Sequence, residues 1–224
     1  MSTMRYDYVM NFPGYLPDTD APADGELCET RDDVVAAMVD DWERYYDDYQ
    51  DAGVPFGDDY TTGLSTLKML REDDSAESVM MPDGRAWNIV SVPWPDDDDV
   101  RTVTRAYLRT LIWTDLEETM GDDAPDVDDL PGGVTDPAAD DVRDFLEHVA
   151  RRGIYGDTLA KVDLDQLGHD FALTRNHHGA GFWDRGLGTL GDDLTEAAHA
   201  QGSALLDTWT DPSDGMGRVY YLHG

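Results

Sequence analysis

Apolar and aromatic residues follow two different periods in the first part of the chain. Residues 5–12 form a short run rich in aromatic and apolar side chains, which is typical of a strand. Residues 34–49 place such side chains at helical spacing, and Thr30 precedes them as an N-cap. Residues 60–71 indicate a shorter helix. The Asp83-Gly84 turn and the apolar run after it indicate a β-hairpin. These elements predict a small α+β module.

The rest of the chain is mainly helical in pattern. Apolar stripes predict helices over residues 98–120, 163–173 and 189–201. Asp136 as N-cap, Pro137 in the first turn and a glycine after the last apolar position predict a further helix between the first two. Short alternating runs close the chain and predict a terminal hairpin, with strands over residues 204–210 and 218–222.

These patterns predict an α+β fold made of small helical and β-hairpin modules. Pro95 and the four aspartates after it mark a change of composition and a strong helix start. We therefore place a boundary there, with an N-terminal α+β module at residues 1–95 and a C-terminal helical module at residues 96–224. The second module carries the terminal hairpin and the glycine-rich segment described below.

The charge of the chain indicates the medium in which it works. The formal net charge is −33, Asp outnumbers Glu by 40 to 9, and only 2 of the 16 basic residues are lysine. Such self-repulsion destabilises a compact state, but molar salt shortens the Debye length to about 3 Å and screens it. The composition therefore predicts a protein of a salt-loving cell. A DNA mimic is the alternative explanation, although the acidic residues are spread over every segment instead of forming one stripe.

Several classes of function have no support in the sequence. Cys28 is the only cysteine, so no internal disulfide is expected. Neither a long apolar run nor a signal-peptide pattern occurs, which predicts an intracellular protein of the host cytoplasm with no membrane partner. Direct nucleic-acid binding is not expected because no basic patch occurs. GxSxG, Walker A, HExxH and CxxC motifs are also missing, so the sequence predicts no metal and no cofactor.

One segment, residues 168–191, combines histidines, charged residues and glycines: GHDFALTRNHHGAGFWDRGLGTLG. Glycines permit close approach of a ligand, and imidazoles titrate near neutral pH. Arg and Asn side chains add hydrogen-bond donors for an anionic group. The segment is therefore the candidate binding surface, with eight candidate residues: His169, Asp170, Arg175, Asn176, His177, His178, Asp184 and Arg185.

Four interpretations of this segment remain open at this stage. It can be a turn whose apolar residues plug the core, or a surface that binds a protein or small ligand. It can be an enzyme site in which His177 or His178 acts as acid and base while Arg175 binds an anionic substrate. A metal site at His169, the His177–His178 pair and Asp184 is the fourth, although adjacent histidines point in different directions and rarely bind one ion.

The same segment resembles a stretch found in short proteins encoded by tailed viruses. The similarity rests on GHDFALTRNHHGAGFWDRGLGTLGDDLTEAA, preceded by the helix AYLRTLIW and an acidic loop and followed by a short hairpin, and it spans residues 100–224. Ala172 stands where this family has a large aromatic residue. The resemblance implies an origin in a haloarchaeal virus or provirus and carries over no catalytic residue. We therefore expect an accessory protein that binds a host or viral protein, with its oligomeric state and any association with the virion left open.

Overall fold

The computed structural model describes residues 3–11, 27–53, 59–210, 212–213 and 217–223. The chain divides into two compact units, one of residues 4–93 and one of residues 1–3 and 94–224. Helices and small antiparallel sheets build the chain, so the predicted α+β class is confirmed. Whether the two units are independent domains stays a prediction.

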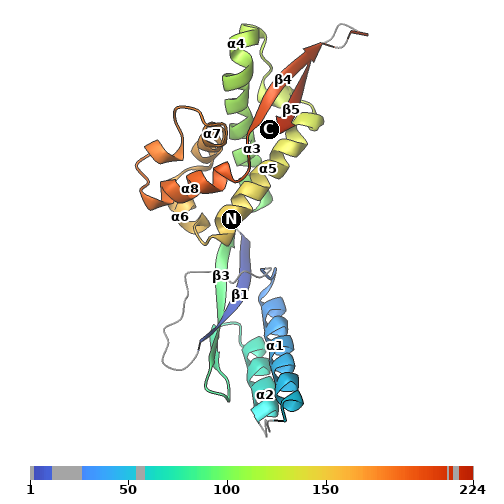
Figure 1. Ribbon diagram of the computed structural model, residues 1–224, viewed down its shortest axis with the longest axis vertical. Helices are drawn as coiled ribbons and strands as arrows, with labels where there is room; N and C mark the ends of the chain where they lie inside the picture. The colour runs from blue at the N-terminus through green and yellow to red at the C-terminus, as the bar shows by residue number, and fades with distance from the viewer. Residues whose placement is uncertain (1–2, 12–26, 54–58, 211, 214–216, 224) are drawn as a thin grey trace. The chain divides into compact units, whose positions relative to one another are not determined.

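The N-terminal unit combines a three-stranded sheet with two helices (Figure 1). The strands are β1 (Thr3–Asn11), β2 (Ser78–Met80) and β3 (Ala86–Trp94), in the order β1-β3-β2, with Val79 of β2 opposite Trp87 of β3. The helices are α1 (Arg31–Asp51) and α2 (Asp59–Glu72). Thr30 caps α1 together with Asp33, as predicted. Phe12, the last residue of the expected first strand, lies outside the described residues.

Aromatic rings form the core of this unit. Tyr8 stacks on Trp87 with ring centroids 5.7 Å apart, and Trp42 meets Trp87 edge to face at 6.0 Å. The indole N–H of Trp42 donates to the carbonyl oxygen of Tyr60 at 3.1 Å, which ties α1 to α2. A Cβ at Gly63 would lie 2.3 Å from the Trp42 ring, so only glycine lets α2 approach that indole. In the aromatic stripe of α1, Trp42 therefore belongs to the core, and Tyr45, Tyr46 and Tyr49 pack against it while partly buried.

The C-terminal unit is a helical assembly with a hairpin against one end (Figure 1). Its long helices are α3 (Asp97–Leu111), α5 (Gly132–Arg151), α7 (Leu164–Arg175) and α8 (Thr189–His199). The hairpin pairs β4 (Ala204–Thr210) with β5 (Gly217–His223). Strand β5 packs on α5, and β4 packs on the π-helical turn that follows α3. The short elements are α4 (Glu117–Met120), α6 (Tyr155–Lys161), η1 (Ile112–Leu116), η2 (Gly121–Asp123), η3 (Val127–Asp129) and η4 (Phe182–Asp184).

The predicted start of α5 was wrong. Asp136 was expected as the N-cap, but the helix starts at Gly132, and Pro137 lies inside it. The backbone N–H groups of Val134 and Thr135 donate to the carbonyl oxygen of Pro131 at 2.8 and 3.1 Å. Val134 is buried, so its apolar side chain continues the inward stripe two residues upstream of the expected cap.

Two further differences concern helix continuity. The helix expected over residues 98–120 is interrupted by a π-helical turn, η1, before α4. Helix α6 was not predicted, because its seven residues are too few to show a clear period. Among the described residues, no helix combines the length and the apolar character that a membrane span requires.

Candidate functional site

Helix α7 and the turn after it hold all eight candidate residues. Asp163 caps the helix by accepting from the backbone N–H of Gln166 at 2.8 Å. Most residues of α7 from Leu167 to Arg175 are buried, because the helix packs against α3 on one side and α8 on another. The first half of the glycine-rich segment is therefore interior structure, and only some of its side chains reach the surface.

Arg175 is almost completely buried, with 1% of its surface exposed. Its guanidinium donates to the Asp141 carboxylate at 2.7 Å and to the Tyr107 hydroxyl at 2.9 Å. It also donates to the carbonyl oxygens of Gln201 at 3.0 Å and Gly202 at 2.8 Å. These partners lie on α3, on α5 and in the turn after α8, so Arg175 ties α7 to all three and is not presented to an external anion.

The sequence did not single out the partners of Arg175. Tyr221 of β5 donates to the same Asp141 carboxylate and lies 2.8 Å from the Tyr107 hydroxyl, so the hairpin joins this polar cluster. Burial raises the pKa of Tyr107 to about 12 and raises that of Tyr221 further. Burial alone would lower the pKa of Arg175, but Tyr107, Asp141 and Tyr221 raise it. The cluster therefore holds a charged arginine among neutral phenols.

Asp170 and Arg185 form a second internal ion pair. Asp170 is fully buried, and Arg185 donates to its carboxylate through Nε at 2.9 Å and through Nη2 at 2.6 Å. The hydrogen bond to Asp170 raises the pKa of Arg185. A bidentate pair of this kind fixes both position and orientation. It ties the turn that follows η4 to the middle of α7.

The turn around η4 is fixed by two more hydrogen bonds. The Phe182 N–H donates to the Thr174 hydroxyl at 3.1 Å, and the Gly181 N–H donates to the Asp184 carboxylate at 3.2 Å. Phe182 is fully buried, whereas its neighbour Trp183 is 43% exposed. The turn therefore presents an indole at the surface on a backbone that is held from both sides.

Asn176 forms a hydrogen bond to the terminal hairpin. Its side-chain carbonyl accepts from the backbone N–H of Ala204 at 2.9 Å, at the first residue of β4. The Asp115 carboxylate does the same two residues later, accepting from the N–H of Leu206 at 2.8 Å. Both side chains satisfy N–H groups on the outer edge of β4, so Asn176 is a structural residue of this edge.

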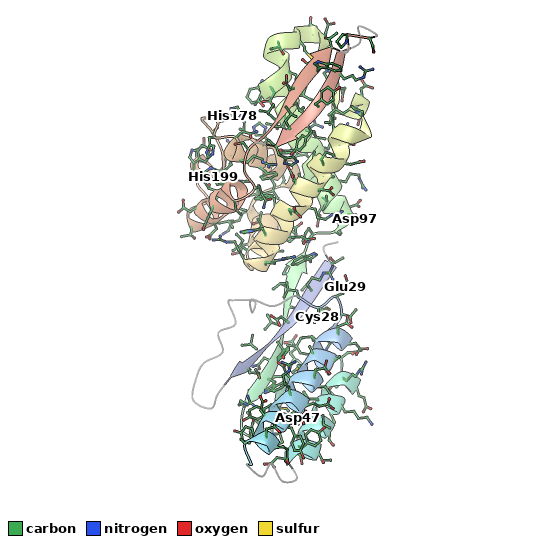
Figure 2. The ribbon with its side chains drawn as sticks, turned by 45° about the vertical axis from the view of Figure 1, so that its right-hand side comes forward. Cys28, Glu29, Asp47, Asp97, His178 and His199 are labelled. Atoms are coloured by element: carbon green, nitrogen blue, oxygen red, sulfur yellow. The ribbon has the colours of Figure 1, made fainter. Side chains whose placement is uncertain are left out.

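The three histidines of the segment do not converge. His169 shares a hydrogen bond of 2.9 Å with the Thr110 hydroxyl and stacks on Trp113. The His177 ring lies 4.5 Å from that of His199, and His178 and His199 lie on the same side of this unit (Figure 2). In the described part of the chain, no three His, Cys, Asp or Glu side chains are placed to hold a metal ion.

His177 occupies a backbone position that favours glycine, with φ of 57°. Its N–H donates to the Thr174 carbonyl and the His178 N–H donates to the Leu173 carbonyl, which is the Schellman arrangement at the end of α7.

We expect His177→Gly to raise the free energy of unfolding by about 1 kcal/mol, because it relieves the left-handed conformation. Urea denaturation at fixed KCl measures this, with His178→Gly as the control that brings no gain.

Four surface hollows in the described part of the chain are lined by residues other than the eight candidates. One of them, of about 780 Å³, lies between residues 120–133 and the far end of the terminal hairpin. Its walls include Met120, Leu130 and Val219, with Asp123 and Asp129 among them. The candidate residues themselves lie on α7 and on the turn that is anchored to it.

Compared with protein-family models, curated proteins and solved structures, the chain gives no match. Its function is therefore inferred from its own residues and geometry.

Proposed function

We propose that this chain is an accessory protein of a virus of salt-loving archaea and that it acts inside the host cell by binding another protein. The composition supports the environment, because a net charge of −33 is tolerated where salt screens it. Exposed aspartates occur in both units, on α1, α3, α5 and α8 among others. The viral origin is proposed from the resemblance noted in the sequence of residues 100–224.

The observation that favours binding is the way Trp183 is presented. Its neighbour Phe182 is buried, and the ion pair between Asp170 and Arg185 holds the turn. An exposed indole on a fixed backbone loses little conformational freedom when it enters a partner's pocket. Tryptophan and arginine are also the residues that contribute most often to binding energy in protein interfaces. We therefore centre the binding surface on Trp183, Asp184 and Arg185.

The geometry gives the enzyme hypothesis less support. That hypothesis needs His177 and Arg175 to face one substrate, but Arg175 donates to groups inside the protein while His177 is exposed beside His199. Anion binding by Arg175 would require those internal hydrogen bonds to break, which is costly for a buried charge. DNA mimicry stays a prediction.

The proposal predicts that Trp183→Ala loses the partner while keeping the fold. Tagged protein is used to capture host proteins at molar KCl, and mass spectrometry compares what each variant retains. We expect the species that the wild type enriches to be retained at least about tenfold less by Trp183→Ala. Circular dichroism checks that the variant is folded.

Met69→Ala is the matched control, because Met69 is an exposed apolar side chain of the other unit. It should retain the same species as the wild type. The proposal fails if Trp183→Ala and Met69→Ala retain the partner equally, or if the wild type enriches no protein.

A further inference from the structure

The terminal hairpin exposes one apolar face. Leu205, Trp209, Tyr220 and Leu222 have between 38% and 49% of their surface exposed. The strand register places Leu205 opposite Leu222, Asp207 opposite Tyr220 and Trp209 opposite Arg218. Residues directly opposite in an antiparallel pair lie on the same face of the sheet. All six side chains therefore share one face, while Leu206 and Tyr221 on the other face pack inward.

The free edge of the hairpin is closed to strand addition. Three alternate N–H groups of β4 are satisfied by side-chain oxygens: Ala204 by Asn176, Leu206 by Asp115 and Thr208 by Asp207. A pairing strand needs those N–H groups as donors. Helix α5 packs against β5. A partner can therefore use the exposed face but not the β4 edge.

This face differs in charge from the rest of the protein. The chain carries 49 acidic and 16 basic residues, yet the face holds one acid, Asp207, and one base, Arg218. A second copy of so acidic a protein is repelled by most of its surface. A balanced apolar face removes that repulsion where two copies would touch.

The chemistry of the face is also complementary to itself. Each pair of opposite residues joins two groups that attract each other: two leucines, an acid and a phenol, an indole and a guanidinium. Consider two copies packed face to face about a two-fold axis that runs parallel to the strands, midway between β4 and β5. This axis places β4 of one copy on β5 of the other. Each residue then meets the copy of its own opposite residue, so Trp209 lies on the partner's Arg218 and Asp207 meets the partner's Tyr220.

We propose that this hairpin face is a homodimer interface, in which two copies pack face to face about that axis. The guanidinium of Arg218 can stack on an indole through its planar face while its N–H groups keep other partners. The hairpin is rigid enough to serve as an interface because the Tyr221 hydroxyl is bound to Asp141 and lies close to Tyr107. This surface is separate from the turn that presents Trp183.

Sedimentation equilibrium at molar KCl tests the interface. The wild type should be dimeric at micromolar concentration, and its dissociation constant should rise when KCl is lowered, since less salt leaves more repulsion unscreened. Trp209→Ala and Arg218→Glu should each raise the dissociation constant at least about tenfold. Trp113→Ala, which removes another exposed indole of the same unit, should not change it.

The register is tested by oxidation of cysteine variants in a Cys28→Ser background. A mixture of Leu205→Cys and a mass-tagged Leu222→Cys should form mixed disulfide dimers in preference to either like pair. A monomeric wild type, or Trp209→Ala and Trp113→Ala dimerising equally well, would overturn the proposal. Mixed disulfides no more frequent than like pairs would overturn the two-fold geometry.

Discussion

Replacing Arg175 with methionine should lower the free energy of unfolding by about 3–5 kcal/mol, the usual effect of removing one partner of a buried ion pair. The methionine fills part of the space but donates no hydrogen bond. The Asp141 carboxylate then loses its charged partner and keeps the Tyr221 hydroxyl as a donor, while the carbonyl oxygens of Gln201 and Gly202 lose the hydrogen bonds from Arg175. Guanidinium chloride is unsuitable because it changes the salt, so urea denaturation at fixed molar KCl is the measurement.

Arg175→Lys separates charge from geometry. One ammonium cannot reach both Asp141 and the two carbonyl oxygens, so most of the loss should remain. Arg101→Met is the matched control, because it removes an exposed arginine that pairs with Asp98 one turn away. It should change stability by less than about 0.5 kcal/mol. A loss below 1 kcal/mol in Arg175→Met would contradict the buried network.

Arg175 also shows where sequence reasoning stops. An arginine beside histidines and glycines is typical of a ligand site, and nothing nearby in the chain indicates otherwise. Its partners Asp141, Tyr107 and Tyr221 lie 34, 68 and 46 residues away along the chain. Their convergence depends on how α3, α5 and β5 pack around α7, which periodicity does not specify.

Prediction from sequence succeeded where neighbouring residues alone determine the structure. The Thr30 cap and the terminal hairpin follow from neighbouring residues, and both are present. The Asp136-Pro137 pair is equally typical of a helix start, but burial of Val134 extends α5 beyond it. Tertiary packing therefore overrode a strong local signal.

The glycine-rich segment is mainly a structural element, and only part of it reaches the surface. Asp170, Arg175 and Asn176 bind groups of the protein itself, and the described structure uses them to hold α7, the η4 turn and the hairpin together. The side chains that the segment exposes include His177 and the run Trp183, Asp184 and Arg185. Two exposed indoles, Trp183 and Trp209, thus mark two separate surfaces on one unit, and each has its own test.

Gly168→Ala should be the second strongly destabilising change, with a loss of about 3 kcal/mol in the free energy of unfolding. Gly168 lies where α7 meets α3. A Cβ there would stand 2.3 Å from the Val103 carbonyl oxygen, 2.8 Å from the Ala106 Cβ and 3.0 Å from the Tyr107 backbone nitrogen. Two of these three atoms belong to the backbone of α3, so no side chain can turn away to make room.

The helices must therefore separate, and the separation also disturbs the polar cluster, because Tyr107 lies on α3 and Arg175 on α7. Gly133→Ala is the control: it adds the same methyl group to a helical glycine of α5 with open space around it. That change should leave stability unchanged or raise it by less than about 1 kcal/mol, since alanine favours a helix over glycine. Equal effects of the two substitutions in urea denaturation would show that α7 does not pack on α3 through Gly168. Opposite signs would establish this glycine as the point of closest approach on which the positions of Arg175, the η4 turn and Trp183 depend.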